Sequence, residues 1–504
     1  MKKGRAPRAA FQTDDKGLAL SGVFLIQWGM LRKPTAQQTM LEMVTLDSLV
    51  PPDHLVRKID AAVDFSFIQP LVEGPYCADN GRPALDPTLM FKALFLGYLF
   101  GIRSERHLVR EIEVNVAYRW FLRLGLTDKV FDASTLSQNR GRRYNDSDVA
   151  QQIFDRVVEQ AIGKGLVDGT VLYTDSTHLK ANANKNRYDQ RVIAKSRADY
   201  WDALDAAIDA DRAAHGKKPL KPAAPREPDA KVTKVSRTDP DAGYMVRDGK
   251  PKGFFYLDHR TVDGRLGIIT DTHVTPANVH DTIPYLGRLD RQRGRFGFDV
   301  GAVGLDAGYA TTGIAKGLED RGILGVTGYR RTTRPKPGMM ARKEFTYDAD
   351  CDTHRCPAGE NLAYATTDRN GYRQYKSDPQ VCRDCPLRDA CTTNAKVQRT
   401  ITRHIWSDVR DEVDGHRLTP WGKRIYKRRK ETVERSFADA KQLHGHRYAR
   451  FRGLIGARTQ CQLAAAAQKS AGFVNGMKAG RLNSRRRFCV WCHVLDGRSR
   501  VRRL

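Results

Sequence analysis

Cysteine is scarce in this chain, with nine in 504 residues. That density is too low for a disulfide scaffold, and the odd count fits a reducing compartment. Long hydrophobic runs are also missing, because a membrane-spanning helix needs ~20 apolar residues and no stretch reaches that length. The run from Leu89 to Ile102 is shorter, and Lys92 interrupts it. We therefore expect a cytoplasmic protein that has no membrane partner.

Acidic residues are the minority among the charges. The chain has 58 Asp and Glu against 86 Lys and Arg, which gives a formal net charge of +28. A field of this size favours a polyanion as the partner, and for a soluble protein that is usually nucleic acid. A basic ribosomal or membrane-surface protein is the alternative. With 40% apolar residues, the chain can build the cores of two or three domains.

Residues 45 to 160 carry a helical pattern. Asp86 and Pro87 are a favoured helix start, and an apolar core helix follows them. Ser104 opens a second helix, and Ser134 or Thr135 is placed to cap a third. Two helices joined by a turn and ending in basic residues are compatible with DNA binding. An ordinary helical bundle with a solvated basic rim fits this pattern equally well.

The pattern changes near residue 168, where strands begin to alternate with helices. The order is a strand, a polar insertion, a hairpin turning at Asp263-Gly264, a helix, a strand, a helix and a last strand. After an interruption, a long basic helix is expected from Thr419 to His444. Such an order predicts an α/β layer architecture.

Three acids stand out against this background. Asp175 and Asp306 each end a predicted strand, where ligand sites gather in α/β sheets. Glu434 lies inside the basic helix. Two Mg²⁺ ions would need several carboxylate oxygens, since Mg²⁺ prefers hard oxygen ligands. Each Asp alone could equally cap a turn, so a metal site requires all three acids to converge.

At these residues the sequence resembles the DDE-type insertion-sequence transposases of bacteria, from about Leu46 to Asn475. The resemblance lies in "HLVRKID…RPALDPTLMFKALFLGYLFGIRSERHLVREI", "YTDSTHLKANANKN", "DTHVTPANVHD", "GLDAGYAT" and "ETVERSFADAKQLHGHRYARFRGL". It implies a ribonuclease-H-like catalytic domain with a mixed sheet and flanking helices, joined to an all-helical N-terminal domain. It also implies that Asp175, Asp306 and Glu434 are catalytic and hold two Mg²⁺ or Mn²⁺ ions.

The family resemblance further implies an activity. The protein would bind the ends of a mobile DNA element, cut phosphodiester bonds with metal-activated water, and join the freed 3′-hydroxyl to target DNA. Synapsis of two ends implies a homodimer, and work on DNA implies a nucleoid-associated protein. The first alternative is a catalytically inactive relic or regulator that only binds DNA. The second is a repair nuclease that ignores the terminal repeats.

The resemblance also places DNA contacts around the third acid. The family Lys that follows the Glu by six residues falls on Lys441. Some branches keep a Tyr and an Arg upstream, but those spacings fall here on Lys427 and Lys430, with Tyr426 and Arg428 adjacent. From Trp421 to Gln460 there are 12 Lys and Arg against 3 acids, as a phosphate-binding surface would require. The residues that we expect to contact DNA are Lys180, Arg428, Arg435 and Lys441.

Four of the cysteines are clustered, in the pattern Cys-Pro-Ala-Gly followed by Cys-x2-Cys-x5-Cys. Four thiolates satisfy one tetrahedral Zn²⁺ ion, and a loop rich in Gly, Pro and charge needs such a staple. Free structural thiols are the alternative, and Cys351 is a possible substitute for the first ligand. The predicted zinc ligands are Cys356, Cys382, Cys385 and Cys391.

These interpretations divide the chain into six parts. They are a poorly structured extension (1–44), a helical DNA-binding domain (45–165), the first part of the catalytic domain (166–329, with a polar insertion at 178–252), a cysteine-rich insertion stapled by zinc (330–412), the last part of the catalytic domain (413–475) and a basic tail (476–504).

Overall fold

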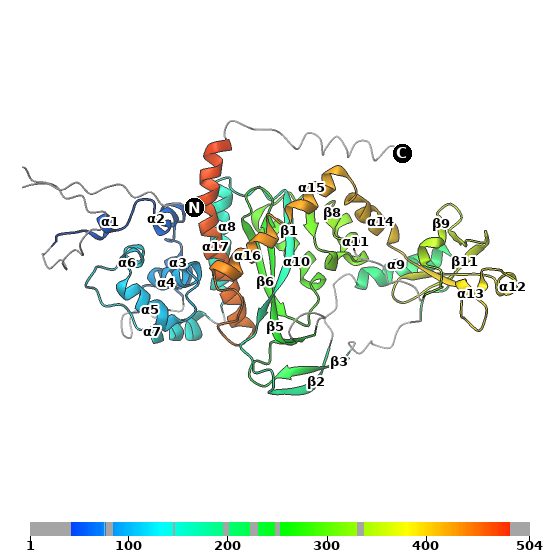
Figure 1. Cartoon of the computed structure of the whole chain (residues 1–504), viewed down its shortest axis with the longest axis horizontal. Coiled ribbons are helices and arrows are strands. Elements are labelled where there is room, and N and C mark those ends of the chain that lie inside the picture. Colours follow the sequence, from blue (N-terminus) through cyan, green and yellow to red (C-terminus); the bar gives the residue numbers. More distant parts are fainter. Residues whose placement is uncertain are drawn as a thin grey trace, which may run out of the picture. The chain divides into compact units, whose positions relative to one another are not determined.

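The computed structural model describes residues 42–74, 76, 84–144, 147–194, 201–221, 230–246, 252–329 and 337–483 (Figure 1). The chain divides into two units, Met1–Thr45 and Leu46–Leu504. Most of the predicted N-terminal extension and the tail from residue 484 onward lie outside the described residues. None of the described helices is both long and apolar enough to span a bilayer.

The region from residue 46 to 163 is helical, as predicted, but its helices are shorter than expected. Asn115 interrupts the second predicted helix, because its backbone is extended and its side chain accepts from the Tyr118 N–H. The cap of the following helix is Asp132, whose side chain accepts from the Ser134 N–H, so the expected cap at Ser134 or Thr135 was wrong. The helices are α1 (Leu46–Leu49), α2 (Leu55–Ala62), α3 (Ile68–Val72), α4 (Pro87–Leu99), α5 (Glu105–Val114), α6 (Val116–Leu122), α7 (Ala133–Asn139), the π-helix η1 (Arg140–Tyr144) and α8 (Val149–Gly163).

Two of the predicted helix starts are confirmed. Asp86 caps α4 by accepting from the Thr88 N–H, with Pro87 in the first turn, and Ser104 caps α5. Helix α4 is buried along almost its whole length, as its apolar sequence predicts.

A mixed sheet follows the helices. Its strands are β1 (Val171–Lys180), β4 (Gly243–Met245), β5 (Gly253–Asp263), β6 (Ile269–Pro276), β7 (Ala302–Leu305) and β8 (Leu324–Thr327). The order is β4-β5-β1-β7-β8, and β6 also pairs with β5. Strands β7 and β8 run parallel to β1, whereas β5 is antiparallel to β1 and β6 is antiparallel to β5. An antiparallel hairpin on one side of the first strand and two parallel strands on the other fit the predicted ribonuclease-H-like sheet.

Helix α10 (Thr282–Phe296) connects β6 to β7, and α11 (Thr312–Glu319) connects β7 to β8. Four helices follow the cysteine-rich insertion in the described part of the chain: α14 (Ser407–His416), α15 (Pro420–Arg428), α16 (Val433–Leu443) and α17 (Leu454–Asn483). The single long helix expected from 419 to 444 was therefore wrong. Thr432 has φ −107° and ψ −95°, which no helix allows, and the chain bends there.

The helical region and the sheet share one hydrophobic core. Ile59 of α2, Phe121 of α6, Leu172 of β1, Val303 of β7 and Phe473 of α17 all belong to one buried cluster. Helix α17 packs against α2, α4, α8 and β6. The N-terminal helices are therefore not an independently packed appendage, because their apolar faces are covered by the last helix of the chain.

The cysteine-rich insertion is built on its own small sheet. Its strands are β9 (Thr346–Asp348), β10 (Thr353–Arg355), β11 (Asn361–Thr367), β12 (Tyr372–Lys376) and β13 (Thr400–His404), in the order β13-β12-β11-β10-β9. Phe345, Leu362, Tyr375 and Ile401 form a separate buried core. The sequence suggested little hydrophobic pattern here, because these four residues are widely spaced along the chain. The short helices are η3 (Arg342–Glu344), α12 (Pro379–Arg383) and α13 (Arg388–Cys391).

The polar insertion after β1 contains a two-stranded ribbon, β2 (Tyr188–Ala194) with β3 (Ala230–Ser236), which the sequence did not predict. Between these strands lies α9 (Trp201–Ala214), the expected Ala- and Asp-rich helix. Residues 222–229 of the expected exposed linker lie outside the described part.

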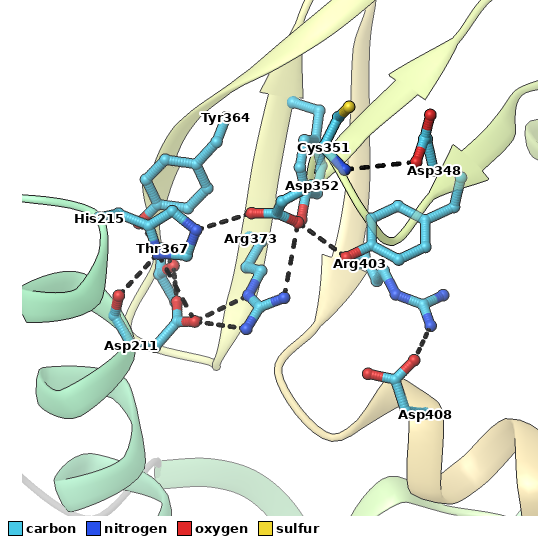
Figure 2. A network of polar contacts seen from close by, with 12 residues as sticks. Asp211, His215, Asp348, Cys351, Asp352, Tyr364, Thr367, Arg373, Arg403 and Asp408 are labelled. Carbon is cyan, nitrogen blue, oxygen red and sulfur yellow. Dashed lines mark hydrogen bonds and ion pairs between the residues drawn. The ribbon is translucent and has the colours of Figure 1, made fainter. Parts of the chain in front are cut away.

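Helix α9 is joined to the small sheet by a polar network (Figure 2). Asp211 accepts from Arg373 of β12 and from the Thr367 hydroxyl of β11. The His215 ring stacks on Tyr364 at 3.8 Å. Its Nδ1 lies 2.7 Å from the Asp211 carbonyl oxygen, and its Nε2 lies 2.7 Å from an Asp352 carboxylate oxygen. Helix α9 of the polar insertion therefore packs on the small sheet of the cysteine-rich insertion.

Asp211→Ala should release α9 from the small sheet, because Arg373 loses its buried counter-charge and a charged hydrogen bond is worth about 1.5–3 kcal/mol. We expect limited trypsin digestion to cut faster after Lys217 than in the wild type. Asp209→Ala removes an exposed carboxylate from the same helix and serves as the control. Equal digestion of both variants would show that the network does not hold α9.

Candidate active site

The pairing of β1 with β7 brings the first two acids together. Thr174 is the register partner of Leu305, the last residue of β7, so Asp175 and Asp306 are the next residues on adjacent parallel strands. Asp175 was expected at a strand tip, but β1 continues along β5 as far as Lys180. Asp306 caps the short helix η2 (Ala307–Tyr309), with its carboxylate accepting from the Ala307 N–H.

Arg429 brings Glu434 to the same place. The Arg429 guanidinium is buried, with Nη2 2.7 Å from Asp175 Oδ2 and Nη1 3.7 Å from Glu434 Oε1. The Asp175 side chain is 20% exposed and the Glu434 side chain 45% exposed, so the group opens toward solvent on the Glu434 side. A single side chain thus bridges acids that are more than 250 residues apart in the sequence.

Arg429 was missed by the sequence analysis, which singled out its neighbour Arg428. The structure leaves Arg428 exposed and buries Arg429. The reason lies in the turn before α16, where the Glu434 N–H donates to the Arg429 carbonyl five residues earlier instead of four. Such π-type turns insert one residue and recur at functional sites. One feature of the sequence could have indicated this extra residue, namely the unusual spacing between the upstream basic residues and Glu434.

A fourth acid lies close to this group. Asp281 accepts from the Ser176 hydroxyl at 2.9 Å, and Ser176 directly follows Asp175. The Tyr309 hydroxyl is buried and has no hydrogen-bond partner in the structure. Burial, followed by the charges of Asp281 and Asp175, raises the pKa of Tyr309 well above its usual value. The site therefore concentrates negative charge around buried polar atoms.

The pKa of Asp175 is raised to about 6. Burial is the main cause, and Asp306 and Asp281 add to it, while the Arg429 guanidinium opposes the rise. A buried carboxylate with other carboxylates close to it forms a site that gains from a cation. The oxygen donors Asp175, Asp306 and Glu434 suit Mg²⁺ or Mn²⁺, and Arg429 already neutralises part of their charge.

The four predicted zinc ligands border one cavity in the small sheet. Burial, with the neighbouring thiols of Cys382, Cys356 and Cys385 contributing, raises the pKa of the Cys391 thiol. Among the described residues, however, three ligand atoms lie within 4.8 Å of one another only at Asp258, His446 and Cys461. The four cysteines therefore border the same cavity, but their sulfur atoms lie farther apart than the ligands of one zinc ion would.

The group of Asp258, His446 and Cys461 has a different explanation. Asp258 Oδ2 accepts from Arg260 Nε at 2.8 Å and from His446 Nε2 at 2.8 Å, and all three side chains are buried. Burial alone would raise the pKa of Asp258, but the charge of Arg260 and the His446 hydrogen bond outweigh it and hold the pKa low. Both oxygens of the fully buried Asp258 carboxylate already accept hydrogen bonds, from Arg260, His446 and Thr272, so we read these residues as a structural ion pair.

The predicted DNA contacts lie on three elements, and Arg428 is the last residue of α15. Arg435 and Lys441 are on α16, and the Arg435 side chain is 73% exposed, with Nε 3.6 Å from Asp439. Lys180 is exposed at the end of β1, where its Nζ lies 5.7 Å from the ring centroid of Tyr448. The backbone of β1 also bonds to the segment after α16, through the Ala449 N–H and the Lys180 carbonyl.

Two family models match the chain. Residues 44–142 match the model "Transposase domain (DUF772)", and residues 355–469 match the model "Transposase DDE domain". Both matches are to transposase models, so these two parts of the chain are similar to transposase domains, in agreement with the resemblance found from the sequence.

The other comparisons add little. A solved structure, the Mos1 mariner paired end complex with Mn, aligns with 12% identity and a TM-score of 0.15. The alignment covers 50% of this chain and 61% of that one. A similarity this low is no evidence for the fold, and the fold is assigned from the strand order instead. No curated protein matches the chain.

The Asp175 carboxyl should make the metal-free protein less stable as the pH rises. Its pKa in the folded state, about 6, exceeds the value of about 3.9 in an unfolded chain. The folded state therefore favours the protonated carboxyl. The stabilisation that results is lost as the pH rises from about 4 to about 6. Relative to Asp175→Asn, the wild type should lose roughly 2–3 kcal/mol of stability across this window in EDTA.

Urea unfolding of both proteins at several pH values measures this difference. Asp299→Asn removes an exposed carboxylate and should not reproduce the effect. A constant difference between wild type and Asp175→Asn from pH 4 to pH 7 would contradict the assigned pKa.

Proposed function

We propose that the protein is an active transposase, which binds the ends of a mobile DNA element, cleaves DNA strands there and transfers the freed ends to target DNA. The observation that supports this most is the convergence of Asp175, Asp306 and Glu434, with Arg429 between two of them. A relic that only binds DNA would have no need to keep three acids in this arrangement.

Asp175, Asp306 and Glu434 would hold two divalent cations, Mg²⁺ or Mn²⁺. When bound, such ions lower the pKa of an attacking water or 3′-hydroxyl and stabilise the leaving oxygen. The chain's own part is to hold the three carboxylates on β1, β7 and α16 and to orient them. Ser176 and Asp281 fix the backbone after Asp175, and the turn before α16 sets the direction of Glu434.

DNA would lie across α16 and the end of β1. Arg435 and Lys441 on α16, Lys180 on β1 and the exposed Arg428 are positioned to neutralise phosphates around the acids. The helical region at residues 46–163 would recognise the element ends, as the resemblance implies for this branch. A homodimer would hold two ends together.

Asp175→Ala, Asp306→Ala and Glu434→Gln should each reduce nicking by at least ~100-fold, because each removes a ligand of the shared cations. The assay follows Mg²⁺- or Mn²⁺-dependent nicking of duplex DNA that carries the terminal repeats flanking the element. Glu431→Gln, which changes an exposed acid three residues before Glu434, is the matched control.

Two outcomes would redirect the proposal. If any of the three variants cleaves as the wild type does, the three acids are not the catalytic group. If the wild type binds the repeats but does not cut them under any metal condition, the protein is a DNA-binding regulator. Equal cutting of repeat and random DNA would instead favour the repair nuclease.

The purified protein should contain one zinc ion per chain, held by Cys356, Cys382, Cys385 and Cys391, once the thiols close onto it. The cavity that the four residues share supports the proposal. Elemental analysis should show that Cys382→Ser and Cys385→Ser lose this zinc. Cys351→Ser is the control, because Cys351 is exposed and lies outside the cavity. Less than half an equivalent in the wild type would remove the zinc site from the proposal.

A further inference from the structure

The ribbon of β2 and β3 has no role in the site described above. Seven residue pairs join its strands, from Tyr188 with Ser236 to Ala194 with Ala230. The strands form a separate two-stranded sheet and do not extend the six-stranded one (Figure 1). At about 3.4 Å per residue, the ribbon is about 23 Å long.

Two features of the ribbon are unusual for a solvent-exposed element. Val192 and Val232 are register partners, and they remain 67% and 62% exposed, respectively. The ribbon is also strongly basic, since residues 185–194 and 230–237 carry six Lys and Arg against a single acid, Asp189. Two exposed valines lie here among many positive charges. This combination indicates a surface that binds a polyanion, one whose interior is partly apolar.

The base of the ribbon is anchored to both catalytic elements. The ribbon follows β1, the strand that carries Asp175, after a short turn in which the Asn184 N–H donates to the Thr238 hydroxyl. Arg452, in the segment after α16, donates to the Asn182 carbonyl at 3.2 Å. A ligand held by the ribbon would therefore be held at a fixed position relative to Asp175 and to the helix that bears Glu434.

Aromatic rings stiffen the same base. Lys234 Nζ lies 4.1 Å from the ring centroid of Tyr188 and 5.1 Å from that of Tyr244. Arg237 pairs with Asp189 across the strands, with Nη2 2.7 Å from the carboxylate. The one acid of the ribbon is thus already neutralised, and the remaining positive charge is available to a partner.

We propose that this ribbon is a DNA clamp, which lies in a groove of the duplex next to the cleavage site. A two-stranded ribbon fits the major groove, which is about 12 Å wide, and the exposed valines would contact apolar base and sugar edges there. A second copy of this chain is the less suitable occupant, because pairing two ribbons would bring their like charges together. The clamp rests on the proposed function, since it assumes that DNA is the substrate.

The test compares two triple variants of equal charge in the full-length protein. Lys185→Gln/Arg187→Gln/Arg191→Gln changes exposed residues of the ribbon, and Lys217→Gln/Lys218→Gln/Lys221→Gln changes exposed residues elsewhere in the same insertion. Fluorescence anisotropy with a labelled random-sequence duplex is recorded without metal from ~50 to ~200 mM salt. The logarithm of the binding constant falls linearly with the logarithm of the salt concentration. For the ribbon variant the slope of this line should be less steep by about 2 to 3, since each lost phosphate contact removes ~0.9 from the slope. The control should keep the wild-type slope.

A second variant tests the apolar pair. Val192→Thr/Val232→Thr keeps β-branched side chains of nearly equal size and so keeps the strands intact. We expect weaker DNA binding with an unchanged salt slope and an unchanged oligomeric state in sedimentation. If instead the oligomeric state changes and DNA binding does not, the ribbon is a contact between protein copies and the clamp is wrong.

The clamp and the transposase proposal fail in different ways. If the wild type cleaves the repeats and the ribbon variant binds with the slope of the control, the clamp is overturned while the proposed function remains. If the ribbon variant loses its contacts but the wild type does not cleave, the clamp stands and the catalytic proposal falls.

Discussion

The site depends on the compensation of buried negative charge. Asp175 is largely buried beside Asp306 and Asp281, and three carboxylates at such a place repel one another unless a cation lies among them. Arg429 supplies that charge in the protein chain itself, and by reaching Glu434 it also fixes α16 against β1. Because Arg429 compensates part of this negative charge, the folded protein can hold a cluster of carboxylates whose oxygens suit divalent cations.

The positions of these groups are set by ordinary elements of the fold. The register of β1 with β7 places the two aspartates side by side, and a shared core joins the sheet to the N-terminal helices through α17. A five-residue turn before α16 then rotates Arg429 inward and leaves Arg428 outside. A shift of one residue in that turn would exchange the two arginines, so the turn determines the electrostatics of the site.

The two insertions add a second level of organisation. Helix α9 leaves the polar insertion and packs on the small sheet of the cysteine-rich insertion through Asp211 and Arg373. The ribbon stays with the six-stranded sheet, since its base bonds to the segment after α16. The polar insertion thus connects the six-stranded sheet to the small sheet where the four cysteines lie.

The sequence alone indicated the resemblance to transposases and the alternation of helices and strands, and it singled out Asp175, Asp306 and Glu434 as candidates, because local patterns and short motifs carry that information. Asp86 and Ser104 could be read as caps, and the turn at Asp263-Gly264 as a hairpin, since each depends on neighbouring residues only. Only the tertiary structure decided that Arg429 pairs with Asp175, that α9 belongs to the second sheet, and that a buried core runs from α2 to α17. Those contacts join residues more than 100 positions apart, and no periodicity in a single sequence encodes which distant side chains meet.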